Sequence, residues 1–144
     1  MTDKQININA IAKIIQENFP DVAFAYLFGS AQTGAVKSGS DVDIAVFYKG
    51  NDLFIRLKIE ELLEKELKGV PIDIIELQKV NPMLAFEALR GVQLFVRKED
   101  VETYLNFYTL TRKLREDRTY WTKKQLEYRG YEVQWSNRIQ TSSN

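Results

Sequence analysis

Hydrophobic residues along the chain form short continuous runs that alternate with longer segments of helical spacing. The runs of strand length lie at 22–28, 42–48, 70–77 and 92–96. A continuous apolar run such as 22–28 is typical of a strand buried on both faces. The intervening pattern predicts helices near 9–19, 52–68, 82–90 and 99–114.

Start and stop signals set the first two helix boundaries. We expect Asn9 or a neighbouring residue to cap the first helix and Pro20 to end it, because proline cannot continue a helix. Asp52 is expected to start the second helix, and Gly69 to end it. The predicted apolar stripe of this helix consists of Leu53, Phe54, Leu57, Leu62, Leu63 and Leu67.

The later elements complete a regular order. Asn81-Pro82 and Gly91 are a start and a stop for a short helix. The helix from Glu99 to about Leu114 is expected to place Val101, Tyr104, Leu105 and Tyr108 on one side. Strands and helices thus alternate, which predicts an α/β (α+β) fold with a small mixed sheet and flanking helices. Residues 131–136 alternate in polarity, and we interpret them as an edge strand or a docking segment.

Composition narrows the chemistry. A chain of 144 residues with 44% hydrophobic and 28% charged residues is typical of one globular domain. Its apolar runs are too short to span a bilayer, and the first five residues do not resemble a signal peptide. The absence of cysteine fits a cytoplasmic location. Because the chain has no histidine, acid–base chemistry falls to carboxylates or to a partner.

Charge is balanced overall but uneven along the chain. The net charge is zero, with a balance of −3 over residues 1–96 and +3 over residues 97–144. This basic excess is modest, and a solvated helix face explains it better than a nucleic-acid groove. We therefore expect no direct contact with nucleic acid.

Acidic residues interrupt the apolar runs at two places. Asp41 and Asp43 open the second run, and alternate residues of a strand share one face about 6.6 Å apart. These carboxylates can converge on one divalent cation, while Val42 and Ile44 point into the core. Asp73 stands where the third run calls for a hydrophobic residue, and we expect it to complete the site.

A Gly-Ser step leaves the first run ten residues before Asp41. Gly29 allows a phosphate to approach the backbone, and Ser30 offers a hydroxyl and an amide where a helix is expected to start. Lys37 and Ser40 are candidates for further phosphate contacts. Mg²⁺ binds carboxylates and substrate phosphates, and two ions about 3.5–4 Å apart can clamp attacking and leaving oxygens. The pattern predicts a metal-dependent nucleotide site.

Each feature also has a plainer explanation. A lone Asp-x-Asp is commonly a cap or a turn, and Lys37 alone is a solvated loop lysine. Asp73 is alternatively an acid facing solvent from an edge strand. We expect Glu76 to share the face of Asp73, which keeps that alternative open. The conjunction of all three acids with the Gly-Ser step favours the functional interpretation.

Gly29-Ser30, ten residues and Asp41-Val42-Asp43 resemble the signature of the DNA polymerase β-like nucleotidyltransferases. Asp73 falls where that superfamily places its third carboxylate. The short length resembles the minimal nucleotidyltransferase (MNT) group, often paired with a HEPN-domain ribonuclease. The resemblance implies a single domain over 1–144, with a core over about 8–97 and a helical or docking extension over about 98–144.

The resemblance also implies a function. Asp41, Asp43 and Asp73 would be the catalytic, metal-binding carboxylates, and Gly29 and Ser30 would bind the nucleotide. The chain would be the antitoxin of a type VII-like toxin–antitoxin pair. With Mg²⁺, as two ions, it would transfer AMP from ATP to a tyrosine of a HEPN ribonuclease toxin bound in a hetero-oligomeric complex, and so neutralise it.

Two other functions stay open. The chain is alternatively a binding antitoxin that inhibits by covering its partner, with no catalysis. It is alternatively an aminoglycoside-type nucleotidyltransferase that acts on a small molecule. The second alternative lacks support because too few residues remain for an acceptor-binding domain. An acceptor protein would bring its own surface, and the region 112–135 is a candidate for docking it.

Overall fold

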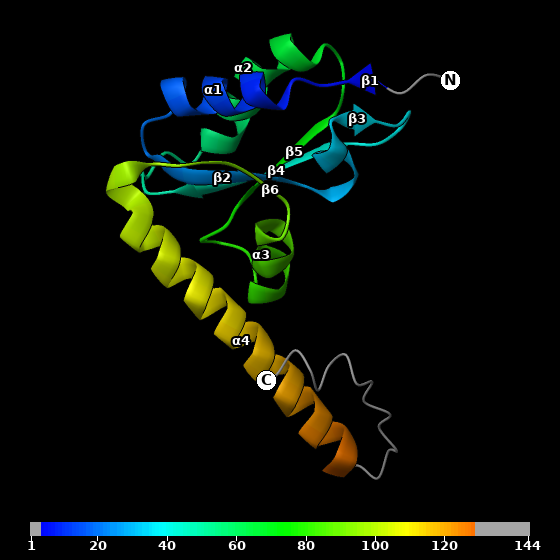
Figure 1. The fold of residues 1–144 in the computed structure, drawn as a ribbon, viewed down its shortest axis with the longest axis vertical. Coiled ribbons are helices and arrows are strands. Elements are labelled where there is room, and N and C mark those ends of the chain that lie inside the picture. Colours follow the sequence, from blue (N-terminus) through cyan, green and yellow to red (C-terminus); the bar gives the residue numbers. More distant parts are fainter. Residues whose placement is uncertain (1–3, 129–144) are drawn as a thin grey trace.

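The computed structural model of the chain describes residues 4–128 and centres on a four-stranded sheet (Figure 1). The strand order is β5-β4-β2-β6. The two inner strands are β2 (Val22–Phe28) and β4 (Val42–Tyr48), and the edges are β5 (Ile72–Glu76) and β6 (Val92–Val96). β4 runs parallel to β5, whereas β2 is antiparallel to both of its neighbours. The prediction of a mixed sheet is confirmed.

Helices cover both faces of this sheet. α1 (Ile8–Asn18) and α2 (Ile55–Leu67) pack on one face. α3 (Pro82–Leu89) and α4 (Val101–Tyr128) pack on the other face (Figure 1). The predicted fold of a small mixed sheet with flanking helices is therefore confirmed.

Strand β4 contributes to both hydrophobic layers. Val42, Ile44 and Val46 are fully buried in the layer beneath α1 and α2. Ala45 and Phe47 belong to the layer beneath α3 and α4. This alternation follows from strand geometry, in which successive side chains point to opposite faces. It fixes which face receives Asp43.

Local capping at α1 and α3 follows the sequence signals closely. The Asn7 side chain caps α1 by accepting a hydrogen bond from the Ala10 N–H at 3.0 Å, so the cap is a neighbour of Asn9. Asn81 caps α3 in the same way through the Leu84 N–H, also at 3.0 Å. In both cases the amide oxygen satisfies a backbone donor that the first helical turn leaves unpaired.

Helix α2 buries Leu63 and Leu67 of the predicted stripe, but the first half of that stripe was wrong. It begins at Ile55, and Leu53, Phe54 and Leu57 are 79%, 63% and 62% exposed. The Asp52 side chain accepts a hydrogen bond from the Phe54 N–H, which forms a turn before the helix. The buried stripe has a spacing of four residues, which keeps it on one helix face, and consists of Ile55, Ile59, Leu63 and Leu67.

Helix α4 is longer than predicted. It follows a 3-10 turn, η2 (Lys98–Asp100), and continues to Tyr128 instead of ending near Leu114. Its far half extends away from the sheet beyond α3 (Figure 1). No glycine or proline occurs between its ends, so no local signal stops it earlier. Residues 131–136 lie outside the described residues.

Only part of the expected face of α4 packs against the domain. Tyr104 and Tyr108 are half-buried in the second layer, and the Tyr104 and Tyr26 hydroxyls are 2.6 Å apart. Val101 and Leu105, which were expected on the same side, are 44% and 55% exposed. The prediction was wrong for these two residues because the aromatic side chains set the rotation of the helix about its axis.

A second, two-stranded sheet has no counterpart in the predictions. β1 (Lys4–Gln5) pairs antiparallel with β3 (Ala35–Val36). β3 lies inside the segment 29–40, which was expected to hold a turn, a short helix and a loop. The short helix is present as the 3-10 helix η1 (Gly29–Thr33).

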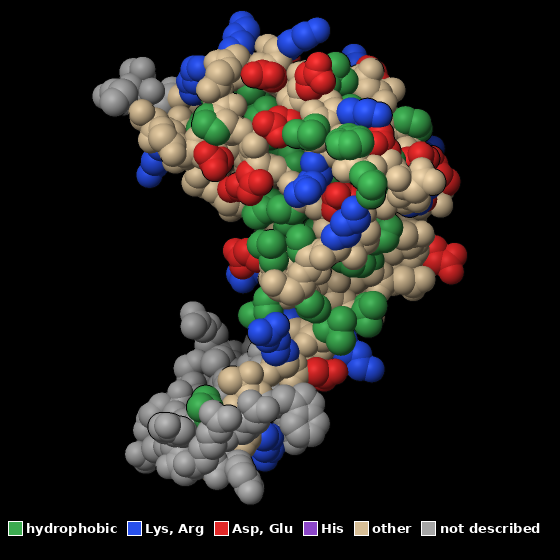
Figure 2. Space-filling view, turned by 180° about the vertical axis from the view of Figure 1, so that it is seen from behind, with side chains coloured by type: hydrophobic (Ala, Val, Ile, Leu, Met, Phe, Trp, Pro, Cys, Tyr) green, Lys and Arg blue, Asp and Glu red, His purple; other side chains and the backbone are tan. Residues whose placement is uncertain are grey.

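The surface carries both charge signs. In Figure 2, basic and acidic side chains are interspersed over the body of the domain. This mixing is seen on the face that Figure 2 shows, and the expectation of no direct contact with nucleic acid stays a prediction. Within the described residues, no helix combines the length and the hydropathy that crossing a bilayer requires.

The corrected stripe of α2 can be tested with a matched pair of truncations. Ile59→Ala removes a fully buried side chain and is expected to lower the free energy of unfolding by about 2–5 kcal/mol. Leu57→Ala, on the exposed face of the same helix, should change it by about 0.5 kcal/mol or less. Urea unfolding of both variants measures the difference. Equal losses would contradict the observed orientation of α2.

Candidate active site

The predicted acids meet at one end of the sheet. Phe28, the last residue of β2, pairs with Asp43 near the start of β4. On the other side of β4, Asp43 pairs with Asp73 in the parallel strand β5. Asp41 lies just before β4 and is exposed. Strand register therefore brings together carboxylates that are up to 32 positions apart in the sequence.

Asp43 and Asp73 lie on the α3 and α4 side of the sheet. Asp43 and Ala45 are two positions apart on β4 and therefore share a face, as do Asp73 and Ile75 on β5. Ala45 and Ile75 belong to the hydrophobic layer beneath α3 and α4. Val42 and Ile44 are fully buried on the opposite side, as predicted. Asp43 itself is only partly buried, so its carboxylate faces the solvent edge of the domain.

Gly29 makes the closest approach to this cluster. Its φ of +74° is in the left-handed region that favours glycine. A Cβ placed on Gly29 would lie 2.3 Å from Oδ2 of Asp43, so any side chain there would have to displace the Asp43 carboxylate. In this structure the group that lies against the Gly29 backbone is the Asp43 carboxylate, and the approach of a phosphate to Gly29 stays a prediction. Ser30 follows it and is exposed at the start of η1.

Electrostatic repulsion is concentrated on Asp43. Partial burial raises the pKa of its carboxyl group, and the nearby carboxylates of Asp73 and Asp41 raise the pKa further. The folded chain thus holds two acids close enough to Asp43 to disfavour ionisation of its carboxyl group. A cluster with this property is a candidate for binding a cation or for proton transfer.

The edge position of Asp73 agrees with the plainer alternative in one respect, because the side chain is exposed on an edge strand. The expectation for Glu76 was wrong. Glu76 lies three residues after Asp73, and therefore on the opposite face of β5. It is 4% exposed and lies 3.6 Å from Arg56 of α2 and 3.3 Å from Lys79. Glu76 is an ion-paired structural acid, separate from the cluster.

Lys37 and Ser40 belong to the loop that leads to Asp41. The Ser40 N–H donates to the Lys37 carbonyl oxygen at 3.0 Å, which closes a tight turn. Within residues 4–128, no side-chain hydrogen bond or ion pair joins either residue to the three acids. Their role as phosphate contacts stays a prediction.

The donor set fits a hard divalent cation in its chemistry. Asp41, Asp43 and Asp73 supply only carboxylate oxygens, which Mg²⁺ prefers. A cation would also relieve the repulsion that raises the pKa of Asp43. Within the part of the chain that the structure describes, no three acids have the geometry of a preformed metal site. In proteins Mg²⁺ commonly takes some of its ligands from substrate phosphates, so three protein ligands are not required for it.

Gly91 supports the site in a way that the sequence did not indicate. A Cβ on Gly91 would lie 2.3 Å from the Leu27 carbonyl oxygen and 2.9 Å from Cβ of Phe28. The residue thus lets the start of β6 pack directly against the end of β2, beside Gly29. In the sequence, Gly91 carries only the signal of a helix stop, because its contacts come from residues more than 60 positions away.

Comparison with known proteins gives consistent results. The family model described as "Polymerase beta, Nucleotidyltransferase" matches residues 9–100. The protein adenylyltransferase MntA of Shewanella oneidensis is 30% identical over 103 residues, which cover 70% of this chain and 73% of that protein.

Two solved structures are similar in fold. A crystal structure of a toxin–antitoxin with AMP-PNP has a TM-score of 0.67 and 25% identity, and the match covers 85% of this chain and 97% of that chain. A tri-AMPylated Shewanella oneidensis HEPN toxin in complex with an MNT antitoxin has a TM-score of 0.61 and 23% identity, with 83% and 92% covered. The family match spans both inner strands, the Gly-Ser step and all three acids, and the chain therefore belongs to the polymerase beta nucleotidyltransferase family.

Proposed function

We propose that this chain is a protein adenylyltransferase that transfers AMP from ATP to a tyrosine hydroxyl of a HEPN-domain ribonuclease toxin. The observation that carries the proposal is the position of Asp43 between Asp41 and Asp73, against the backbone of Gly29. In this role the chain is the antitoxin of the pair, and adenylylation neutralises the toxin.

The relatives support the substrate and the partner. MntA, which is 30% identical, is named a protein adenylyltransferase. One similar structure contains AMP-PNP, an analogue of ATP, and another contains an AMPylated HEPN toxin with its MNT antitoxin.

The proposed function also assigns roles to the two parts of the chain. We propose a nucleotidyltransferase core over about 8–97 and an extension over about 98–144 that contributes to docking the toxin, without direct contact with nucleic acid. The absence of cysteine agrees with action in the cytoplasm.

The reaction is an in-line displacement at the α-phosphorus of ATP. The tyrosine oxygen forms a bond to that phosphorus as the bond to the bridging oxygen breaks, and pyrophosphate leaves. Asp73 is the candidate acceptor of the tyrosine proton, since the chain has no histidine and Asp73 is exposed on the edge strand β5. Gly29 and Ser30 would contact the phosphates, with Lys37 and Ser40 as candidates for outer contacts.

Mg²⁺ is the cation that this site would take. Asp41 and Asp43 would hold it, with Asp73 completing the ligand set, and two ions are expected. Bound there, the metal would neutralise charge on the triphosphate and on the leaving pyrophosphate.

The function can be tested by intact-mass measurement of the partner toxin incubated with this chain, ATP and Mg²⁺. We expect an AMP-sized mass increase on the toxin. Asp43→Asn should slow the transfer by at least about a hundredfold, because losing a metal-ligand charge removes several kcal/mol of transition-state stabilisation. Asp21→Asn, an exposed acid at the opposite end of β2, is the matched control and should retain activity.

Other outcomes would identify the alternatives. A stable complex that neutralises the toxin without any adduct, and equally well with Asp41→Asn/Asp43→Asn, would make this chain a binding antitoxin. Adducts on aminoglycosides in the absence of a partner would indicate a small-molecule nucleotidyltransferase. Either result would contradict the proposed reaction.

The same substitution should not harm the metal-free fold. Because the pKa of Asp43 is raised in the folded chain, its ionisation lowers the free energy of unfolding above that pKa. The penalty disappears below the unfolded pKa of about 4. We expect metal-free Asp43→Asn to melt about 1–4 °C above the wild type at pH 7, with the gap closing as the pH falls to about 4.

Calorimetry across this pH range measures the difference, again with Asp21→Asn as the control. A large drop in the melting temperature of Asp43→Asn would show that the acidic cluster is structural.

A further inference from the structure

The N-terminal strand β1 contacts both loops that lead to the acids. One loop is the segment from Gly29 to Asp41, and the other connects α2 to β5 ahead of Asp73. These loops approach the site from opposite sides of β4. The contacts of β1 with them involve hydrogen bonds from Lys4 and its neighbours, and no buried hydrophobic side chain of β1 itself.

The first connection is the small sheet. Lys4 pairs with Val36 and Gln5 pairs with Ala35. The Ile6 N–H extends the pairing by donating to the Gly34 carbonyl oxygen at 2.9 Å. β3 lies between the Gly-Ser step and Asp41, so β1 restrains the middle of the loop that joins the two halves of the motif.

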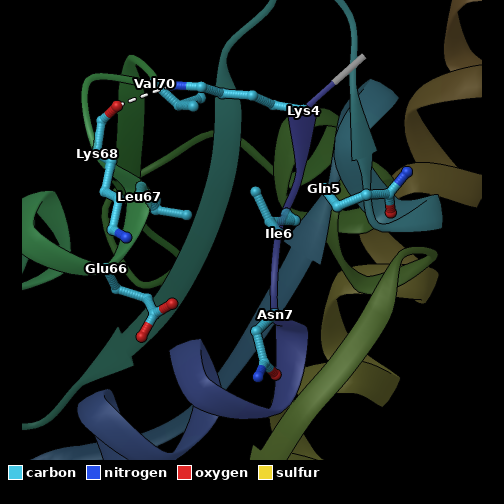
Figure 3. Close-up of a pocket in the computed structure, with 8 residues that line it drawn as sticks. All are labelled: Lys4, Gln5, Ile6, Asn7, Glu66, Leu67, Lys68 and Val70. Atoms are coloured by element: carbon cyan, nitrogen blue, oxygen red, sulfur yellow. Dashed lines mark hydrogen bonds between the residues drawn. The ribbon is translucent and has the colours of Figure 1, made fainter. Parts of the chain in front are cut away.

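The second connection is a single side chain. Nζ of Lys4 donates to the Lys68 carbonyl oxygen at 2.8 Å, across 64 positions of sequence. Figure 3 shows the Lys4 side chain reaching over a small pocket between β1 and the end of α2. Lys68 is the C-cap of α2 and adopts a left-handed φ of +46°. An ammonium group is favoured there because the last carbonyl groups of a helix are unpaired and carry partial negative charge.

The Lys68 carbonyl lies a few residues before the strand pairing that positions the acids. Three residues later, the Pro71 carbonyl oxygen accepts a hydrogen bond from the Val42 N–H at 2.9 Å. Val42 lies between Asp41 and Asp43, and Asp73 lies two residues after Pro71. This hydrogen bond lies at the start of the β4–β5 pairing, and that pairing places Asp43 opposite Asp73.

We propose that Lys4 is a positioning residue for nucleotidyl transfer. The backbone of Lys4 pairs with β3, and its ammonium group donates to the Lys68 carbonyl. Lys4 thereby holds the two loops that lead to the acids at a constant spacing. It acts through Lys68 and Pro71 and does not touch the substrate. This inference rests on the proposed function for its kinetic consequence, while its structural consequence is independent of any activity.

The exposure of Lys4 distinguishes this positioning role from packing in the hydrophobic core. Lys4 is exposed, and within the described residues its side chain forms no ion pair. Lys65, in the last turn of the same helix, is also an exposed lysine, and no hydrogen bond or ion pair is formed by its side chain within residues 4–128. It provides a matched control for the loss of one positive charge near the end of α2.

The kinetic test compares three full-length variants with the toxin, ATP and Mg²⁺. Lys4→Met keeps the aliphatic stem and removes the donor, and we expect kcat to fall about tenfold with KM for ATP changed by less than about twofold. The melting temperature should move by less than about 2 °C. Lys4→Arg restores a donor and should recover most of the activity, and Lys65→Met should behave as wild type.

Amide hydrogen exchange tests the same coupling without any turnover. In Lys4→Met, the Val42 amide should exchange faster than in the wild type, whereas the Ala45 amide in the middle of β4 should not change. If the wild type transfers no AMP, the proposed function fails, yet this exchange comparison still decides the role of Lys4.

Two results would overturn the inference. One is unchanged exchange at Val42 together with unchanged kcat in Lys4→Met. The other is a loss of melting temperature and activity that Lys4→Arg does not restore, which would make Lys4 a general contributor to the fold.

Discussion

The alternation of side chains along β4 is the constraint on which the rest of the site depends. Val42, Ile44 and Val46 are fully buried beneath α1 and α2, and this commits every second residue to the opposite face. A slip of one position would place Asp43 inside that hydrophobic layer without a partner, at a cost of several kcal/mol. Burial of these core residues therefore determines on which face of the sheet the Asp43 carboxylate lies.

The acidic end of the sheet is built from features that oppose stability. Partial burial and the two carboxylates of Asp73 and Asp41 raise the pKa of Asp43, and Gly29 occupies a left-handed conformation directly against it. Gly91 closes the same corner by allowing direct backbone contact with the end of β2. Such a cluster persists because the two hydrophobic layers on either side of the sheet supply the stability that it lacks. Repulsion between carboxylates is typical of sites that bind a cation.

Predictions from the sequence were most accurate where one local cause acts. Residues 22–28 and 42–48 became β2 and β4 at the predicted limits, and Asn81 capped α3. Predictions of which residues of a helix face the sheet were less accurate. Phe54 lies before α2 and Leu57 on its exposed side, because the turn at Asp52 and the packing of Ile59 set the rotation of that helix. Apolar residues alone do not show which of two possible stripes the sheet will cover.

The sequence by itself determined the identity of the acids, the Gly-Ser step and the alternation that separates Asp43 from the core. Those features are local, since spacing along one strand decides them. Tertiary structure alone decided that Asp73 lies opposite Asp43, that Glu76 turns away to Arg56, and that Lys4 reaches Lys68. These pairings depend on strand order and register, which arise from burying two layers at once and are not encoded in any short segment.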